Sequence, residues 1–252
     1  GLHSIIWGDT RNNLSELTVL LSDGSKAVFK NLTKEEYNDK LKLPGLEGDI
    51  YRAIDNMMRI GANKEAIKNG FPRASVKRRN TGYALDFILE MIMQGSNINL
   101  CKLIAGSEGT LCFILSAKLK LTDLPPGGKS IVAVHTKTIR EALLANLVAL
   151  KHSCSASELV DDVILEYTKT NINQSKNRFF VEGDPRAILM VEFFDEKDSG
   201  LATRTKNFIE ELKENGLGYA YPLLVGNDSL KAWELRKAGL GLLRNEPGDT
   251  QP

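Results

Sequence analysis

The chain has 252 residues, of which 42% are hydrophobic and 26% charged. This is an ordinary globular composition, with enough length for two modest domains. Thirty-three basic residues nearly cancel 32 acidic ones and leave a formal charge of +1. No overall field therefore favours nucleic acid or an anionic membrane, and any partner has to be argued from local features.

Cysteine usage and hydropathy indicate the compartment. Cys101, Cys112 and Cys154 are far apart among apolar residues, which suits reduced, buried thiols, and no CxxC spacing indicates zinc or an iron–sulfur cluster. No apolar run approaches the roughly 18 residues that span a bilayer, and no charged-then-apolar leader opens the chain. We expect a soluble, cytoplasmic protein without a transmembrane segment.

The first residues, Gly1 to Gly8, are apolar and favour a strand, whereas the last eight stop in a turn. We expect both ends to be cuts through a larger protein. Glu16–Phe29 alternates apolar residues across Asp23-Gly24, a dipeptide typical of a β-hairpin turn.

Helical signals follow the hairpin. Thr33 and Glu36 form a capping box for a short helix, and apolar residues from Ile50 to Ile60 recur at helical spacing until Gly61 ends them. A further helix is expected over Leu85–Met93, closed by Gly95.

A basic triplet, Lys77 to Arg79, precedes the turn residues Asn80-Thr81-Gly82. The segment is either a solvated loop or a place where positive charge and backbone N–H groups gather for a phosphate or carboxylate. A nucleic-acid site is not expected, because the triplet has no interleaved aromatic residues and no wider basic patch.

Two prolines and two glycines in residues 123–128 form the strongest linker. We place the domain boundary there, giving domains 1–125 and 126–252. The second domain is predicted to contain strands at Ser130–His135, Ala187–Phe194 and Tyr219–Leu224, and helices at Thr138–His152, Val160–Thr168, Leu201–Asn215 and Ser229–Ala238. This order favours a two-layer, ferredoxin-like α+β module with helices on one face.

The segment AGSEGTLCFIL contains two glycines, Gly106 and Gly109, which allow backbone to approach a ligand closely and N–H groups to converge on an oxyanion. A structural tight turn before a buried core strand is the simpler interpretation. Glu108 argues against a bare phosphate site, because its carboxylate would repel pyrophosphate. A ribose hydroxyl, an adenine amine or a backbone donor would suit it.

Four sequence blocks together resemble the FAD-linked oxidase family, which has the vanillyl-alcohol oxidase or p-cresol methylhydroxylase (PCMH) fold. They are GLHSIIWG (1–8), RRNTGYALD (78–86), GSEGTLCFI (106–114) and WELRKAGLGLL (233–243). Within the family the chain is most similar to the long D-2-hydroxy acid dehydrogenases fused to an iron–sulfur module, a group that acts on acids such as D-lactate, glycolate and D-2-hydroxyglutarate. Cys112 and Phe113 depart from the glycine and isoleucine usual after TL.

The resemblance implies an α+β fold: the C-terminal half of a PCMH-type FAD-binding domain, then a ferredoxin-like substrate (cap) domain that we expect to be incomplete. It implies FAD as cofactor and oxidation of a D-2-hydroxy acid to the 2-oxo acid by hydride transfer to flavin N5. The matched FAD-binding positions are Gly1, His3, Asn80, Thr81, Gly106, Ser107, Glu108, Gly109, Thr110, Leu111, Cys112 and Ile114.

For the substrate carboxylate we expect Arg236, with Lys237 as a second cation, because a planar guanidinium matches a carboxylate. Alternatively, the Arg236 guanidinium reaches water or forms a salt bridge with Glu234 or Glu246. No catalytic base is assigned in this segment. His3, His135 and His152 are scattered, so any metal or iron–sulfur site is expected outside it.

Two functions are compatible with the sequence. The chain is either a segment of an FAD-dependent dehydrogenase, with a small 2-hydroxy acid and an electron acceptor as partners, or a noncatalytic ligand-binding or regulatory module of the same fold. A homodimer is compatible with either.

Overall fold

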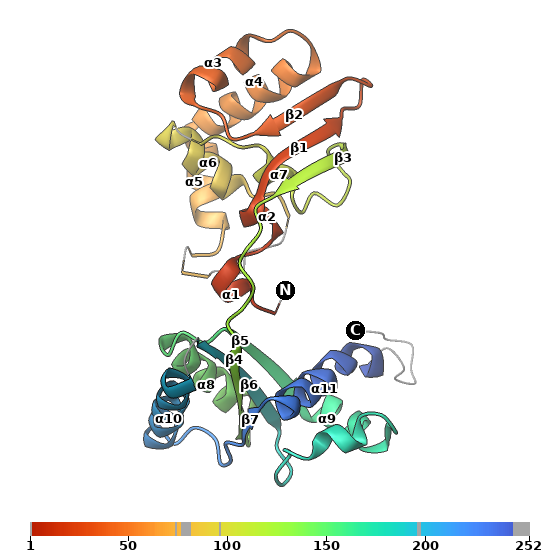
Figure 1. Ribbon diagram of the computed structural model, residues 1–252. Coiled ribbons are helices and arrows are strands. Elements are labelled where there is room, and N and C mark those ends of the chain that lie inside the picture. The colour runs from red at the N-terminus through yellow and green to blue at the C-terminus, as the bar shows by residue number, and fades with distance from the viewer. Residues whose placement is uncertain (1, 74, 77–81, 96, 196–197, 244–252) are drawn as a thin grey trace. The chain divides into compact units, whose positions relative to one another are not determined.

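The computed structural model describes residues 2–73, 75–76, 82–95, 97–195 and 198–243. These form two compact units, one over residues 3–123 and the other from residue 124 onward (Figure 1). Each unit combines helices with an antiparallel sheet, so the α+β class expected from the sequence is confirmed.

The first unit is built on a three-stranded antiparallel sheet in the order β2-β1-β3. Its strands are β1 (Leu14–Leu20), β2 (Lys26–Lys30) and β3 (Phe113–Leu119). The hairpin of β1 and β2 is confirmed, with Gly24 at φ 82° in the turn, a conformation that glycine adopts without steric cost.

The described part of this unit contains seven helices (Figure 1). They are α1 (Ser4–Trp7), α2 (Thr10–Asn13), α3 (Lys34–Lys42), α4 (Gly45–Arg59), α5 (Gly61–Gly70), α6 (Leu85–Gln94) and α7 (Cys101–Ile104), which packs against β1. Their apolar faces bury Tyr51, Met58 and Ile88 against Leu17 and Phe29 of the sheet. Burial also raises the pKa of the Cys101 thiol to about 11, so this cysteine behaves as a small apolar core residue.

Local signals at helix ends agree with the structure. The Thr33–Glu36 capping box is present at the start of α3, and Gly95 ends α6 in the left-handed conformation, φ 68°. Gly61, however, both follows α4 and begins α5, a helix that the sequence did not reveal. The same glycine therefore follows the end of one helix and begins the next, and the sequence signal indicated only the first of these.

Two expectations for the first unit are wrong. Residues 4–7 of the opening segment form a short helix rather than a strand, because Trp7 and Gly8 donate backbone hydrogen bonds to His3 and Ser4. Strand β3, expected to be buried, is exposed along its whole length, since it pairs only with β1 and forms an edge of the sheet.

The second unit has a four-stranded antiparallel sheet in the order β5-β6-β4-β7. Its strands are β4 (Gly128–Thr136), β5 (Ala156–Asp161), β6 (Ala187–Asp195) and β7 (Leu223–Val225). Its helices are α8 (Ile139–Lys151), α9 (Asp162–Thr170), the 3-10 helix η1 (Ser175–Arg178), α10 (Asp198–Glu214) and α11 (Asn227–Leu243). The first and third strands lie at the centre, which is the ferredoxin-like topology that we expected.

Helices cover both faces of this sheet rather than one (Figure 1). On one face Phe193 of β6 contacts Phe208 of α10, with ring centroids 5.4 Å apart. On the other face Met190 of the same strand packs in one cluster with Trp233 and Leu235 of α11. The single-face expectation fails because the central strands β4 and β6 are apolar on both sides.

Two element boundaries in the second unit also differ from expectation. The helix expected from Val160 is preceded by strand β5, and Asp161 caps the helix that follows by accepting a hydrogen bond from Ile164 N. The strand expected over Tyr219–Leu224 is regular only from Leu223, although Ala220 already forms an isolated bridge with His135 of β4. Pro222 has no N–H to donate and interrupts the ladder between them.

Candidate functional site

A tight turn at Ser107–Thr110 lies at the centre of the candidate site. Thr110 N donates to Ser107 O at 3.0 Å, and both central residues have positive φ, 51° at Glu108 and 78° at Gly109. Positive φ at both central positions is the signature of a type I′ turn. Glycine adopts it freely, whereas glutamate rarely does.

This turn presents free backbone donors. Within the described residues, the N–H groups of Glu108 and Gly109 have no hydrogen-bond partner, and both residues are exposed. A Cβ atom added at Gly109 would meet nothing within 4 Å. The turn therefore offers two adjacent donors and open space, a combination that suits close approach by an electron-rich ligand.

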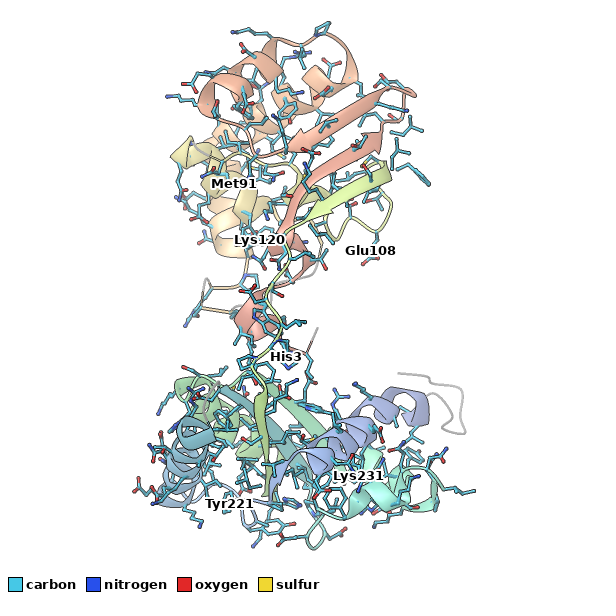
Figure 2. The ribbon with its side chains drawn as sticks, in the orientation of Figure 1. His3, Met91, Glu108, Lys120, Tyr221 and Lys231 are labelled. Carbon is cyan, nitrogen blue, oxygen red and sulfur yellow. The ribbon has the colours of Figure 1, made fainter. Side chains whose placement is uncertain are left out.

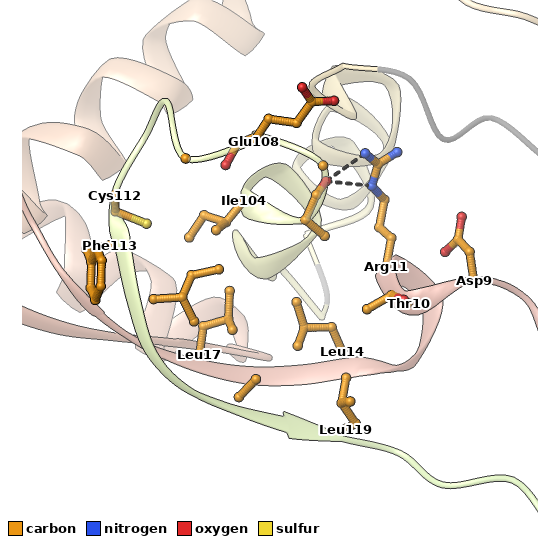
Figure 3. Close-up of a pocket in the computed structure, with 16 residues that line it drawn as sticks. Asp9, Thr10, Arg11, Leu14, Leu17, Ile104, Glu108, Cys112, Phe113 and Leu119 are labelled. Carbon is orange, nitrogen blue, oxygen red and sulfur yellow. Dashed lines mark hydrogen bonds between the residues drawn. The ribbon is translucent and has the colours of Figure 1, made fainter. Parts of the chain in front are cut away.

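A groove of about 750 Å³ runs from this turn along β3 (Figure 3). Its walls are mainly apolar and its rim is polar. The lining residues are Asp9, Thr10, Arg11, Leu14, Leu17, Ile104, Ala105, Gly106, Ser107, Glu108, Gly109, Cys112, Phe113, Ile114, Ala117 and Leu119. An apolar wall with a few polar groups at one end fits part of a nucleotide with an aromatic ring.

Six of the residues predicted for cofactor binding line the groove. They are Gly106, Ser107, Glu108, Gly109, Cys112 and Ile114. Glu108 projects away from the apolar wall into solvent (Figures 2 and 3), so its carboxylate lies at the rim. Phe113 is 70% exposed along the same strand, which leaves a large apolar surface beside the turn.

Cys112 lies between this groove and a second, apolar groove of about 370 Å³ lined by α4, α7 and the β1–β2 hairpin. Burial raises the pKa of its thiol, so the group is protonated at neutral pH and acts as part of the apolar wall. Leu111 lines only the second groove.

Thr110 lies behind the turn rather than in the groove. Its Oγ1 donates to Ser107 O at 2.6 Å and shares a hydrogen bond with Tyr83 Oη at 2.7 Å. Tyr83 belongs to the NTGY block, so this contact joins two of the four sequence blocks. Asn80 and Thr81 of the same block lie outside the described residues, as does Gly1.

The predicted residue His3 does not line the groove; it immediately precedes α1, and its ring packs edge-on against Trp7 at 5.1 Å between centroids. Arg11, in contrast, lines the groove and was missed by the sequence analysis. It is only 6% exposed and donates to Ala105 O and Gly82 O. These partners are 94 and 71 residues away, so the one local signal for this arginine was its position inside a capping motif, Asp9 to Asn12.

Arg236 lies on α11, and its Nη2 donates to Glu158 Oε2 of β5 at 2.9 Å. The salt-bridge alternative is thus realised with a different carboxylate; Glu246 lies outside the described residues. The side chain remains 30% exposed, and its buried Nε has no partner among the described residues. Lys237 is exposed on the same helix.

The buried Glu192 ties the same helix to the sheet. Its Oε2 accepts from Trp233 Nε1 at 2.9 Å, and its Oε1 accepts from Ser155 Oγ at 3.1 Å. The helix that carries Arg236 is therefore attached to the sheet at Trp233, about one turn before Arg236.

In the described part of the chain, no group of three or more His, Cys, Asp or Glu side chains is placed to hold a metal ion. Nor does any helix there have the length and apolar character needed to cross a membrane.

An α+β unit with a glycine turn beside an apolar groove, followed by a ferredoxin-like unit, is the arrangement implied by the resemblance to the FAD-linked oxidase class. Curated relatives narrow that class. A D-2-hydroxyglutarate dehydrogenase of Pseudomonas putida is 25% identical over the full chain, those of Haemophilus influenzae and Escherichia coli are 26% and 25% identical, and the chain covers 25% of each. These matches confirm the resemblance to D-2-hydroxy acid dehydrogenases.

The chain therefore spans about a quarter of the length of the curated relatives it matches. No protein-family model matches it. Among solved structures, an alkyldihydroxyacetonephosphate synthase aligns with 97% of this chain and 35% of its own, at 14% identity and a TM-score of 0.49.

Proposed function

We propose that the chain is one segment of an FAD-dependent oxidoreductase that converts a D-2-hydroxy acid into the 2-oxo acid. Residues 1–125 would form the second half of the FAD-binding domain, and residues 126–252 would form part of the substrate domain. The similarity to D-2-hydroxyglutarate dehydrogenases over the whole chain supports this reaction class.

The groove beside the Ser107–Thr110 turn is the observation that carries the proposal. Leu14, Leu17 and Ile104 supply an apolar wall for a ring, and the free N–H groups of Glu108 and Gly109 supply donors for oxygen atoms of the nucleotide. Because the Glu108 carboxylate lies at the rim, we infer contact with the adenosine ribose side rather than with pyrophosphate alone.

Bound FAD would accept the hydride from the substrate α-carbon. The residues of this chain would bind and orient the cofactor and the substrate. Arg236 would hold the substrate carboxylate with the exposed part of its guanidinium, while Glu158 fixes the orientation of that group through Nη2. Lys237 would add a second positive charge nearby.

We propose that the other groups needed for the reaction are not part of this segment. The base that removes the hydroxyl proton, the electron acceptor, and any metal ion or iron–sulfur cluster would be supplied by other parts of the longer protein. A cytoplasmic location and a homodimer remain predictions.

The direct test is to purify the longer protein that contains this chain and to measure its visible absorbance and its turnover. We expect a flavin spectrum and oxidation of D-2-hydroxyglutarate, D-lactate or glycolate with a dye as acceptor. A flavin-free protein that binds a 2-hydroxy acid without oxidising it would instead support the noncatalytic ligand-binding module.

A further inference from the structure

We propose that Arg11 is a positioning residue for the nucleotide: it does not bind the flavin itself but holds the Ser107–Thr110 turn in the shape that the flavin contacts. The inference rests on the proposed function. It assigns a role to a residue outside the four sequence blocks that carry the resemblance.

The contacts of Arg11 connect three distant segments of the first unit. Nε and Nη2 both donate to Ala105 O, at 3.1 and 2.7 Å (Figure 3). Nη2 also donates to Gly82 O at 2.9 Å. Ala105 directly precedes Gly106, where the turn segment begins, and Gly82 directly follows Asn80 and Thr81 in the sequence. One guanidinium thus holds a backbone carbonyl next to each of two sequence blocks that the resemblance assigns to the cofactor.

Arg11 is itself held firmly. Its side chain is 6% exposed, and the short helix α2 that carries it begins with a reciprocal capping box between Asp9 and Asn12. The Lys102 ammonium group donates to the backbone carbonyls of Arg11 and Asn12. Because the guanidinium is buried and planar and has several donors, it restrains the positions of the carbonyl groups to which it donates.

The turn has a reason to need such support. Glu108 and Gly109 both have positive φ, and for a residue with a Cβ this conformation is strained. The Thr110 N to Ser107 O bond closes the turn internally, and the Ser107 N to Ile104 O bond joins it to the adjacent end of α7, but neither bond attaches it to a segment distant in the chain. Arg11 and the Tyr83–Thr110 bond supply that attachment.

Arg11→Lys is the test variant, because lysine keeps the charge but cannot make the forked contact. Arg52→Lys is the matched control: Arg52 Nη1 also donates to two carbonyl groups of this unit, Leu41 O and Leu43 O, both at 2.8 Å, but it does not line the groove. Arg11→Gln gives a second, uncharged test variant in case the lysine finds the same carbonyls.

The first measurement is amide hydrogen exchange on the 252-residue chain without cofactor. We expect exchange at Ser107 and Thr110 to become about tenfold faster or more in both Arg11 variants, and to stay unchanged in Arg52→Lys. Equal exchange of the turn in all four proteins would overturn the inference.

The second measurement is the dissociation constant for FAD of the longer protein, by titration of the flavin-depleted form. We expect about tenfold weaker binding in the Arg11 variants and no change in Arg52→Lys, with similar losses of melting temperature in both. Weaker FAD binding that merely follows the fall in melting temperature would make Arg11 a structural residue only.

The two measurements separate the two claims. If the wild-type longer protein binds no flavin, the proposed function fails, whereas the exchange experiment still reports whether Arg11 orders the turn. If the wild type binds flavin and the Arg11 variants bind it equally well, the positioning role fails alone.

Discussion

At the residue scale, Gly109 has a backbone conformation that favours glycine, and open space surrounds the position that its side chain would occupy. Its φ is 78°, and a Cβ atom there would meet no protein atom within 4 Å. We expect Gly109→Val to abolish retention of FAD by the longer protein, because the valine would occupy the space through which the nucleotide approaches the turn. The flavin-to-protein absorbance ratio after purification measures this.

Gly45 provides the control for that substitution. It has φ 79° and equally open surroundings at the start of α4, but it lies outside the groove. Both valine variants should lose about 1–2 kcal/mol of unfolding free energy from backbone strain, but only Gly109→Val should lose flavin. A yellow Gly109→Val protein with normal flavin content would remove this turn from the cofactor site.

Arg236 gives a prediction on the substrate side. Arg236→Lys should raise the KM for the 2-hydroxy acid about tenfold or more, with a smaller effect on kcat, because lysine cannot provide the same planar pair of donors. Arg204→Lys is a suitable control, since Arg204 is similarly exposed and pairs with Asp195 in the same unit. An unchanged KM for Arg236→Lys would exclude this residue from substrate binding.

His135 links the stability of the second unit to pH. Burial lowers the pKa of its imidazole below 6.5, and its Nε2 accepts a hydrogen bond from Glu182 N. Since the folded state favours the neutral ring, its stabilising contribution is complete above pH ~6.5 and is lost as pH falls from there toward the lower folded-state pKa.

Denaturant unfolding at a series of pH values tests this linkage. Wild type should lose stability as pH falls below ~6.5, and His135→Gln should lose less over the same range. His152→Gln is the control, because His152 is bound to Glu211 near the surface. A wild-type curve that His135→Gln leaves unaltered would contradict the assignment.

The residues of the candidate site were only partly readable from the sequence. The glycine spacing that predicts the turn is local, and both glycines lie in the groove. Arg11 was hidden because its partners Ala105 and Gly82 are distant in the chain and are backbone carbonyls, which leave no side-chain pattern. Glu158, the partner of Arg236, was missed for the same reason of distance.

At the scale of the elements, patterns with strong end signals were placed correctly. The hairpin at Asp23-Gly24, helix α3 with its capping box and helix α6 before Gly95 all rest on local chemistry. Strand β5 was missed because its polar residues, such as Ser157 and Glu158, resemble a loop, and only pairing with β6 makes it a strand. Long-range pairing overrode local propensity there.

The end of β5 offers a test at this scale. Asp161 Oδ1 accepts from Ile164 N at 3.0 Å and caps α9. We expect Asp161→Ala to reduce the unfolding free energy of the second unit by about 1 kcal/mol, the usual contribution of such a cap. The exposed Asp184→Ala serves as control, and equal stability of the two variants in denaturant unfolding would contradict the capping role.

At the scale of the whole molecule, each unit has its own apolar core, but the candidate groove is open along an exposed strand. With the chain spanning a quarter of its relatives, we expect half of the nucleotide contacts to come from other segments. FAD titrated into the 252-residue chain should therefore bind more weakly than micromolar. Sub-micromolar affinity, measured by quenching of flavin fluorescence, would mean that this chain holds the complete site.

In the proposed reaction, a D-2-hydroxy acid reduces the flavin of the longer protein. The most direct measurement is the visible absorbance of the longer protein before and after anaerobic addition of D-2-hydroxyglutarate, with the L-isomer as control. We expect the flavin band to bleach with the D-isomer and to persist with the L-isomer. A band that persists with D-2-hydroxyglutarate, D-lactate and glycolate alike, or the absence of a flavin band, would contradict the claim.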